Sequence, residues 1–200
     1  MAISRISQST VQAGFPKFNN TWDGLSAVGA MEPISAITLA SASASIEFNN
    51  IPSTYTHLQI RGIMRITTGT AGTNDLQIKF NSDSGSNYAY HALMGSGAAA
   101  QIGDASTQTI GTAGRAVIPR NSSGANIYGT IVIDILDYVN TSKYKTLRGL
   151  GGMDNNSTNG YISLTSSLWQ STSAITSITL TDEGSGTFSQ YSSFSLYGIK

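Results

Sequence analysis

Residues 46–66 alternate apolar and polar side chains with a period of two, and this pattern constrains the fold more than any other feature of the chain. A turn over residues 49–53 separates a short strand from a longer one. One face of the longer strand carries Leu58, Ile60, Gly62, Met64 and Ile66, and the other carries Gln59, Arg61 and Arg65. Because side chains of a strand point alternately to the two faces of a sheet, this spacing predicts a sheet with one buried face.

Short strands of the same kind follow one another to the C-terminus, and no segment favours a helix. The predicted strands span residues 34–39, 45–48, 57–66, 75–80, 88–94, 115–118, 126–138, 144–150, 160–168, 175–180 and 194–199, with weaker signals near Ile102 and Ile110. Pro119 makes 115–118 an edge strand or a strand end. The predicted fold is all-β, an antiparallel two-sheet sandwich with a jelly-roll-like topology, and the pattern leaves the strand order open.

The strand over residues 126–138 is apolar on both faces, which predicts a central strand covered on both sides. Asp134 shares the face of Tyr128, Val132 and Leu136. A buried carboxylate is costly unless it is paired. We therefore expect Asp134 to form a buried ion pair, and the candidate partners are Arg61, Arg65 and Arg148.

The first thirty residues differ from the rest and predict an extended N-terminal arm (1–30) that precedes the sandwich domain (31–200). The arm combines Gly and Pro with isolated apolar side chains, namely Ile3, Ile6, Phe15, Phe18 and Trp22. Such side chains mark a contact. Two interpretations remain open: the arm docks on another protein or on a second copy, or it packs on its own domain.

The amino-acid composition limits the classes of partner that the protein is expected to bind. Only 11% of the 200 residues are charged and the net charge is +0, whereas a soluble domain usually carries about 25% charged residues. Such a surface gives no long-range attraction to nucleic acid or anionic lipid, so we expect neither as a partner. The chain lacks Cys, a signal-peptide pattern and any apolar run long enough to span a membrane, which predicts a soluble protein without disulfides.

Candidate catalytic groups are sparse. His57 and His91 are accompanied by no nucleophile motif, and we interpret them as polar strand residues. Asp134 and Asp137 could pair with Glu32, Glu47 or Asp154 as glycosidase carboxylates, but a structural ion pair is the favoured reading. The oxygen-rich segments 81–87 and 154–159 lack the spacing of a calcium loop and read as turns. We therefore expect no enzyme activity, no cofactor and no metal.

Several segments resemble a β-sandwich domain of structural proteins from tailed bacteriophages, especially marine ones. The resemblance covers roughly residues 33–200 and rests on segments 33–39, 45–62, 80–88, 133–138, 145–148, 169–180 and 194–199. Residues 1–7, Met-Ala-Ile-Ser-Arg-Ile-Ser, are similar to the start of many phage fibre and appendage proteins. No catalytic motif belongs to that family.

The resemblance implies a non-enzymatic virion protein, assembled in the bacterial cytoplasm, that decorates the capsid or forms a tail appendage. The expected partners are other copies of the chain, most simply in a homotrimer, and a major capsid or tail protein. The alternative is a tail-fibre module that recognises a host surface glycan, since nine Tyr and two Trp suit interfaces and sugar platforms alike.

Overall fold

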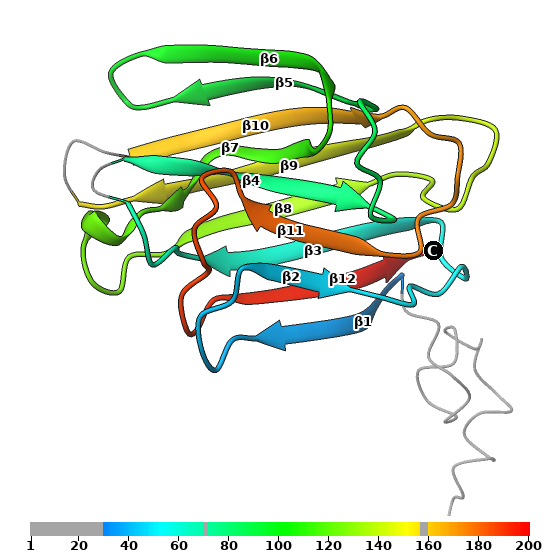
Figure 1. Cartoon of the computed structure of the whole chain (residues 1–200), viewed down its shortest axis with the longest axis horizontal. Helices are drawn as coiled ribbons and strands as arrows, with labels where there is room; N and C mark the ends of the chain where they lie inside the picture. Colours follow the sequence, from blue (N-terminus) through cyan, green and yellow to red (C-terminus); the bar gives the residue numbers. More distant parts are fainter. Residues whose placement is uncertain (1–29, 70–71, 157–159) are drawn as a thin grey trace, which may run out of the picture.

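The computed structural model describes residues 30–69, 72–156 and 160–200, which form two antiparallel sheets packed as a sandwich (Figure 1). The predicted all-β sandwich is confirmed. The described residues contain twelve strands, against the eleven ranges predicted above, together with one short 3-10 turn, η1 (Asn121–Ser123). The segment 95–114, whose strand signals are weak in the sequence, supplies one whole strand and the start of another.

The larger sheet has eight strands and the smaller one has four. In spatial order the larger sheet contains β1 (Met31–Thr38), β12 (Ser193–Ile199), β3 (His57–Met64), β8 (Gly129–Ile135), β9 (Lys145–Asp154), β10 (Gly160–Trp169), β5 (Tyr88–Gly95) and β6 (Ala100–Gln108). The smaller sheet contains β2 (Ser45–Phe48), β11 (Ile178–Asp182), β4 (Thr73–Phe80) and β7 (Gly111–Pro119). The segment around 115–118 is therefore an edge strand, as Pro119 predicts.

Eight of the strands have the connectivity of a jelly roll, in which a long hairpin is rolled up so that its two arms pair along their length. The first strand pairs with the last, β1 with β12, and the next pair inward is β2 with β11. Then follow β3 with β8 and β4 with β7. Successive pairs alternate between the two sheets, which is what makes the rolled hairpin a sandwich.

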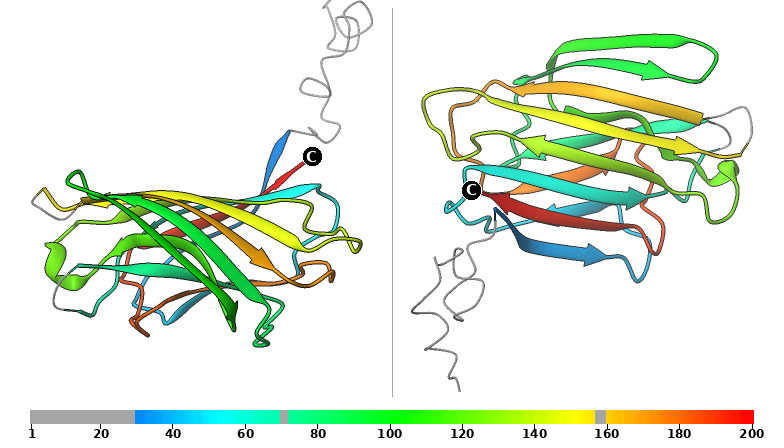
Figure 2. Two further views of the ribbon diagram at one scale, coloured as in Figure 1. Left: turned by 90° about the horizontal axis from the view of Figure 1, so that it is seen from above. Right: turned by 180° about the vertical axis from the view of Figure 1, so that it is seen from behind.

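Two inserted hairpins enlarge one sheet of this jelly roll. β5–β6 lies between β4 and β7 in the chain, and β9–β10 lies between β8 and β11. Both hairpins join the larger sheet beyond β8, which extends it from four strands to eight. Figure 2 shows the outer face of this sheet from behind, with β6 and β5 in green at one edge and β1 in blue at the other.

The core lies between the two sheets and is built from the inward side chains of alternating strands. It includes Phe48, Leu58, Ile60, Ile78, Phe80, Tyr88, Ile131, Ile133, Leu147, Trp169, Leu180, Phe194 and Leu196. Phe80 and Trp169 form the centre of an aromatic cluster, with ring centroids 5.4 Å apart. Burial of such side chains from water is the main source of stability in a sandwich whose sequence has no Cys to form disulfides.

β7 passes directly beneath the inserted strands, and small residues allow its backbone to come close to the larger sheet. A Cβ atom at Gly149 would collide with the carbonyl oxygen of Ala113, and one at Gly129 would collide with that of Val117. The Gly- and Ala-rich sequence of β7 and these two glycines therefore serve close packing of two backbones.

Two expectations need correction. The strand predicted over 126–138 is shorter, Gly129–Ile135, and its second face is not covered: Thr130 and Val132 are exposed. The strand predicted over 175–180 begins and ends later, at Ile178–Asp182, because Ile175 belongs to the preceding connection, where its N–H donates to the carbonyl of Tyr138. The predicted arm, with Ile3, Ile6, Phe15, Phe18 and Trp22, lies outside the described residues, apart from Ala30.

Candidate assembly surface

A straight row of exposed aliphatic side chains crosses the outer face of the larger sheet. We call it the apolar row; its members are Val132 on β8, Leu150 on β9, Leu164 on β10, Leu93 on β5 and Ile102 on β6. Each is the direct cross-strand partner of the next. Between 37% and 85% of each residue is exposed, so the row is a surface feature rather than part of the core. Contiguous exposed apolar side chains of this kind mark interaction sites.

The apolar row exists because of the inserted hairpins. Four of its five strands belong to β5–β6 and β9–β10. On the other half of the same face, across β3 and β12, the row continues with polar residues, Arg61 and Ser195. The hairpins therefore add an apolar half to a face that would otherwise be polar.

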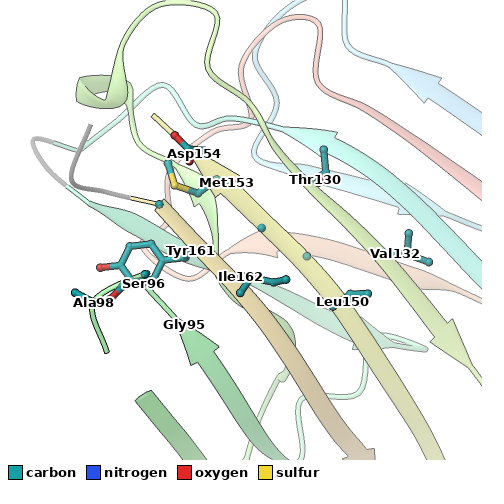
Figure 3. A pocket seen from close by; sticks show the side chains of 14 residues that line it. Gly95, Ser96, Ala98, Thr130, Val132, Leu150, Met153, Asp154, Tyr161 and Ile162 are labelled. Carbon is teal, nitrogen blue, oxygen red and sulfur yellow. The ribbon is translucent and has the colours of Figure 1, made fainter. Parts of the chain in front are cut away.

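A second row of residues lies next to the apolar row, on the side of the hairpin turns, and two of its five residues are glycines. This glycine row consists of Thr130, Gly152, Ile162, Gly95 and Ala100, again direct partners strand by strand. With no side chains at Gly152 and Gly95, the face is hollowed there. The hollow has a volume of about 920 Å³ and is bounded by Val132, Leu150 and Ile162 (Figure 3).

The row on the opposite flank is polar and carries charges. This charged row consists of Asp134, Arg148, Ser166, His91 and Asp104. Arg148 Nη2 lies 3.0 Å from Asp134 Oδ2, and Gln59 Nε2 donates to Asp134 Oδ1 over 2.8 Å. Asp134 and Arg148 of this row therefore neutralise one another on the face.

The structure thus gives Asp134 a basic partner, Arg148, but corrects the expectation that the pair is buried. The Asp134 side chain is 24% exposed and that of Arg148 is 68% exposed. Asp134 lies on the outer face of β8, where no second layer covers it. Of the other candidate partners, Arg61 donates to Gln59, and Arg65 donates to the backbone and side chain of Asn121.

The remaining candidate catalytic residues are not brought together. His57 and His91 stand on β3 and β5, with β8, β9 and β10 between them. His57 Nδ1 accepts a hydrogen bond from the Asp137 backbone N–H over 2.9 Å. Among the carboxylates, Asp137 pairs with Lys143 and Glu32 with Lys200, and each pKa is lowered chiefly by that lysine.

The oxygen-rich segment 81–87 is a turn held by its own side chains. Asp83 Oδ1 accepts from the Gly85 N–H, and Oδ2 accepts from Asn87 and from the indole N–H of Trp169. These hydrogen bonds, that to Trp169 first, lower the pKa of Asp83. In the part of the chain that the structure describes, no cluster of three or more His, Asp or Glu residues could hold a metal ion.

Sequence reasoning missed three buried charged residues, Asp75, Lys145 and Asp182. Lys145 is 1% exposed, and its ammonium group donates to the carbonyl oxygens of Asn140, Lys143 and Thr172 over 2.6, 3.1 and 3.1 Å. It ties the loop before β9 to the loop after β10, and burial lowers its pKa. The apolar row was also missed. Strand 88–94 has apolar residues on both faces, but in strand 160–168 the apolar Ile162 and Leu164 lie on the exposed face, and the buried face carries Ser163, Thr165 and Ser167.

No protein-family model matches the chain, and no curated protein is significantly similar to it. Among the described residues, no helix is long and apolar enough to cross a membrane.

Proposed function

We propose that the protein is a non-enzymatic structural component of a bacteriophage particle that works by packing against other proteins through the outer face of its larger sheet. The observation that carries the proposal is the apolar row, five exposed aliphatic residues in register across neighbouring strands. The sequence resemblance to phage β-sandwich proteins supports a location in the phage particle, where the protein would either decorate the capsid or form a tail appendage.

The chemistry of the face supports a protein partner. Its centre is aliphatic, Arg148 and Asp134 in the flanking row pair with each other, and the chain as a whole has a net charge of +0. Protein interfaces have an apolar centre that is depleted in charge and a polar rim. A face with this arrangement suits dense packing in an assembly.

The same chemistry argues against the alternative of glycan recognition at this face. Sugar rings stack on exposed aromatic side chains, and the centre of this face has Leu, Val and Ile instead. Among the described residues that line the hollow, Tyr161 is the only aromatic one (Figure 3). We therefore favour assembly over carbohydrate binding.

The predicted N-terminal arm has a second role in this proposal. Phe15, Phe18 and Trp22 lie among Gly, Pro and Asn and cannot cover themselves with a regular element, so we expect a neighbouring copy or an underlying capsid or tail protein to cover them. Deletion of residues 1–25 should leave a folded sandwich that no longer joins particles.

The test is to follow tagged protein into purified particles by quantitative mass spectrometry and immunogold labelling. The full chain should purify with particles in a fixed stoichiometry, and the version without residues 1–25 should stay in the soluble fraction. A high copy number would indicate capsid decoration, and a low one a tail or fibre. Complete particles that never contain the protein would overturn the proposal.

A further inference from the structure

We infer that the outer face of β8, β9, β10, β5 and β6 binds the same face of a second copy, around a two-fold axis that follows the apolar row. The inference rests on the proposed assembly role of this face and names its partner and symmetry. It is carried by the shape and chemistry of the three rows that cross these five strands.

The size of the face suits a partner of this kind. Five strands at a spacing of about 4.8 Å and about eight residues long at about 3.3 Å each cover roughly 24 by 26 Å, or about 600 Å² before side-chain relief is counted. A biological interface buries at least about 1,000 Å² in total, or about 500 Å² on each partner. The face is therefore large enough for a specific contact between two copies.

The apolar row is self-complementary under this symmetry. A rotation by 180° about a line along the row places Val132, Leu150, Leu164, Leu93 and Ile102 each against its own counterpart. The strands of the two copies then stay aligned, which is a preferred arrangement for two sheets packed face to face. All five apolar side chains leave water in a single contact.

The flanking rows are complementary in size under the same rotation. It turns the charged row of one copy over the glycine row of the other, strand by strand. On β9, Arg148 comes over Gly152 of the second copy, and on β5, His91 comes over Gly95 of the second copy. On β10 the sizes of the two residues are reversed, because the small Ser166 of the charged row comes over the large Ile162 of the second copy. Large side chains therefore meet the hollow and a small one meets the protruding isoleucine.

A rotation about a line parallel to the strands lacks this match. It would set Asp134 over Asp104 of the second copy, and the like charges would repel each other. It would also leave the hollow over Gly152 and Gly95 facing its own counterpart. The axis along the apolar row is therefore the favoured one.

The first test measures the mass of the purified full chain by light scattering and sedimentation equilibrium. We expect a dimer whose dissociation constant rises by roughly thirtyfold or more in L164D, because a charge then stands at the centre of the contact. Y191D is the matched control, since Tyr191 is exposed but lies in the β11–β12 connection outside the face. Circular dichroism and thermal unfolding check that both variants remain folded.

The second test addresses the hollow. A Cβ atom at Gly95 would meet only the Ile162 side chain, at 3.5 Å, so the folded chain tolerates a side chain there. G95W makes the face more apolar, which would strengthen nonspecific association, but it fills the space that receives His91 of the second copy. We expect G95W to weaken the dimer, and the added change H91A to restore it.

The third test identifies the two-fold axis by cross-linking between introduced cysteines. Because the chain has no Cys of its own, the introduced thiols are the only ones that can react. With a short bis-maleimide, L164C and I102C should both form cross-linked dimers, because each faces its own counterpart. Rotation about the strand direction would bring together the two Leu164 positions but not the two Ile102 positions. Y191C should not cross-link.

The outcomes separate this inference from the proposed function. A wild-type monomer at high concentration, a trimer that L164D leaves intact, or cross-linking at residue 164 without residue 102 would each overturn the two-fold contact. None of these results would remove the protein from particles, which the incorporation experiment measures separately. A dimer with the expected variant behaviour supports the inference even if the protein is absent from particles.

Discussion

Gly149 on β9 lies directly against the backbone carbonyl of Ala113 on β7, so close that a Cβ atom at Gly149 would overlap the oxygen. This contact holds the edge strand of the smaller sheet beneath the inserted hairpin β9–β10 of the larger one. The inserted strands that carry the apolar row are thus anchored on their inner side by backbone packing.

We expect Gly149→Ala to destabilise the fold by at least about 2 kcal/mol, because two backbones must move apart to admit one methyl group. Urea unfolding followed by circular dichroism measures the change. Gly95→Ala is the matched control, since its Cβ meets only Ile162, and it should stay within about 0.5 kcal/mol of wild type. Equal effects of the two substitutions would contradict the close approach.

Removal of the Asp134 carboxylate should have a small effect, now that the pair with Arg148 is known to be exposed. An ion pair in contact with water contributes less than about 1 kcal/mol. In the L164D background, where the inferred contact between two copies is removed, we expect Asp134→Ala to cost no more than that, and a double-mutant cycle with Arg148→Ala to give a coupling energy below it. A cost of several kcal/mol in this background would contradict the exposed position of the pair on the single chain.

Lys145 should matter far more than its neighbour Lys143. Lys145→Met leaves three backbone carbonyl oxygens without their donor, and we expect a loss of about 3 kcal/mol in the free energy of unfolding. The Lys143 side chain is 56% exposed and pairs with Asp137, so Lys143→Met should cost less than about 1 kcal/mol. Thermal unfolding of both variants at one pH distinguishes these roles, and similar values would argue against the buried ammonium site.

Asp75 should make the fold more stable as the pH falls from 7 to 5. Burial raises the pKa of its carboxyl from 3.8 to about 6, although the Ala116 N–H and Arg115 oppose the rise. In this window the folded chain takes up a proton that the unfolded chain does not, so the free energy of unfolding increases, by about 1 kcal/mol.

Asp75→Asn should abolish that gain, whatever it does to stability at pH 7. The carboxyls with lowered pKa values, Glu32, Asp83 and Asp137, are present in both proteins, so their effect cancels when the variant is compared with wild type. Urea midpoints at pH 7, 6 and 5 supply the measurement. An unchanged slope in the variant would show that Asp75 does not titrate in this range.

The candidate surface could be predicted only in part. The alternation in residues 57–64 correctly assigns Leu58, Ile60 and Met64 to the core, because a strand with one apolar face has only one way to bury it. In β8 both faces are apolar, and the sequence predicts that both are covered. Ile131 and Ile133 are buried, whereas Val132 is exposed. Apolarity identifies residues that gain from burial, but not whether a second layer exists to bury them.

The sequence by itself determined the fold class, most strand positions and the inward face of strands such as 57–64, since these follow from local periodicity. Only the tertiary structure decided the strand order and hence the apolar row. Val132 and Ile102 belong to one row because β5–β6 and β9–β10 insert at different points of the chain and add to the same sheet edge. Pairing of that kind joins residues far apart in the sequence, and it depends on the whole set of strands that compete for each edge rather than on the pattern within any one of them.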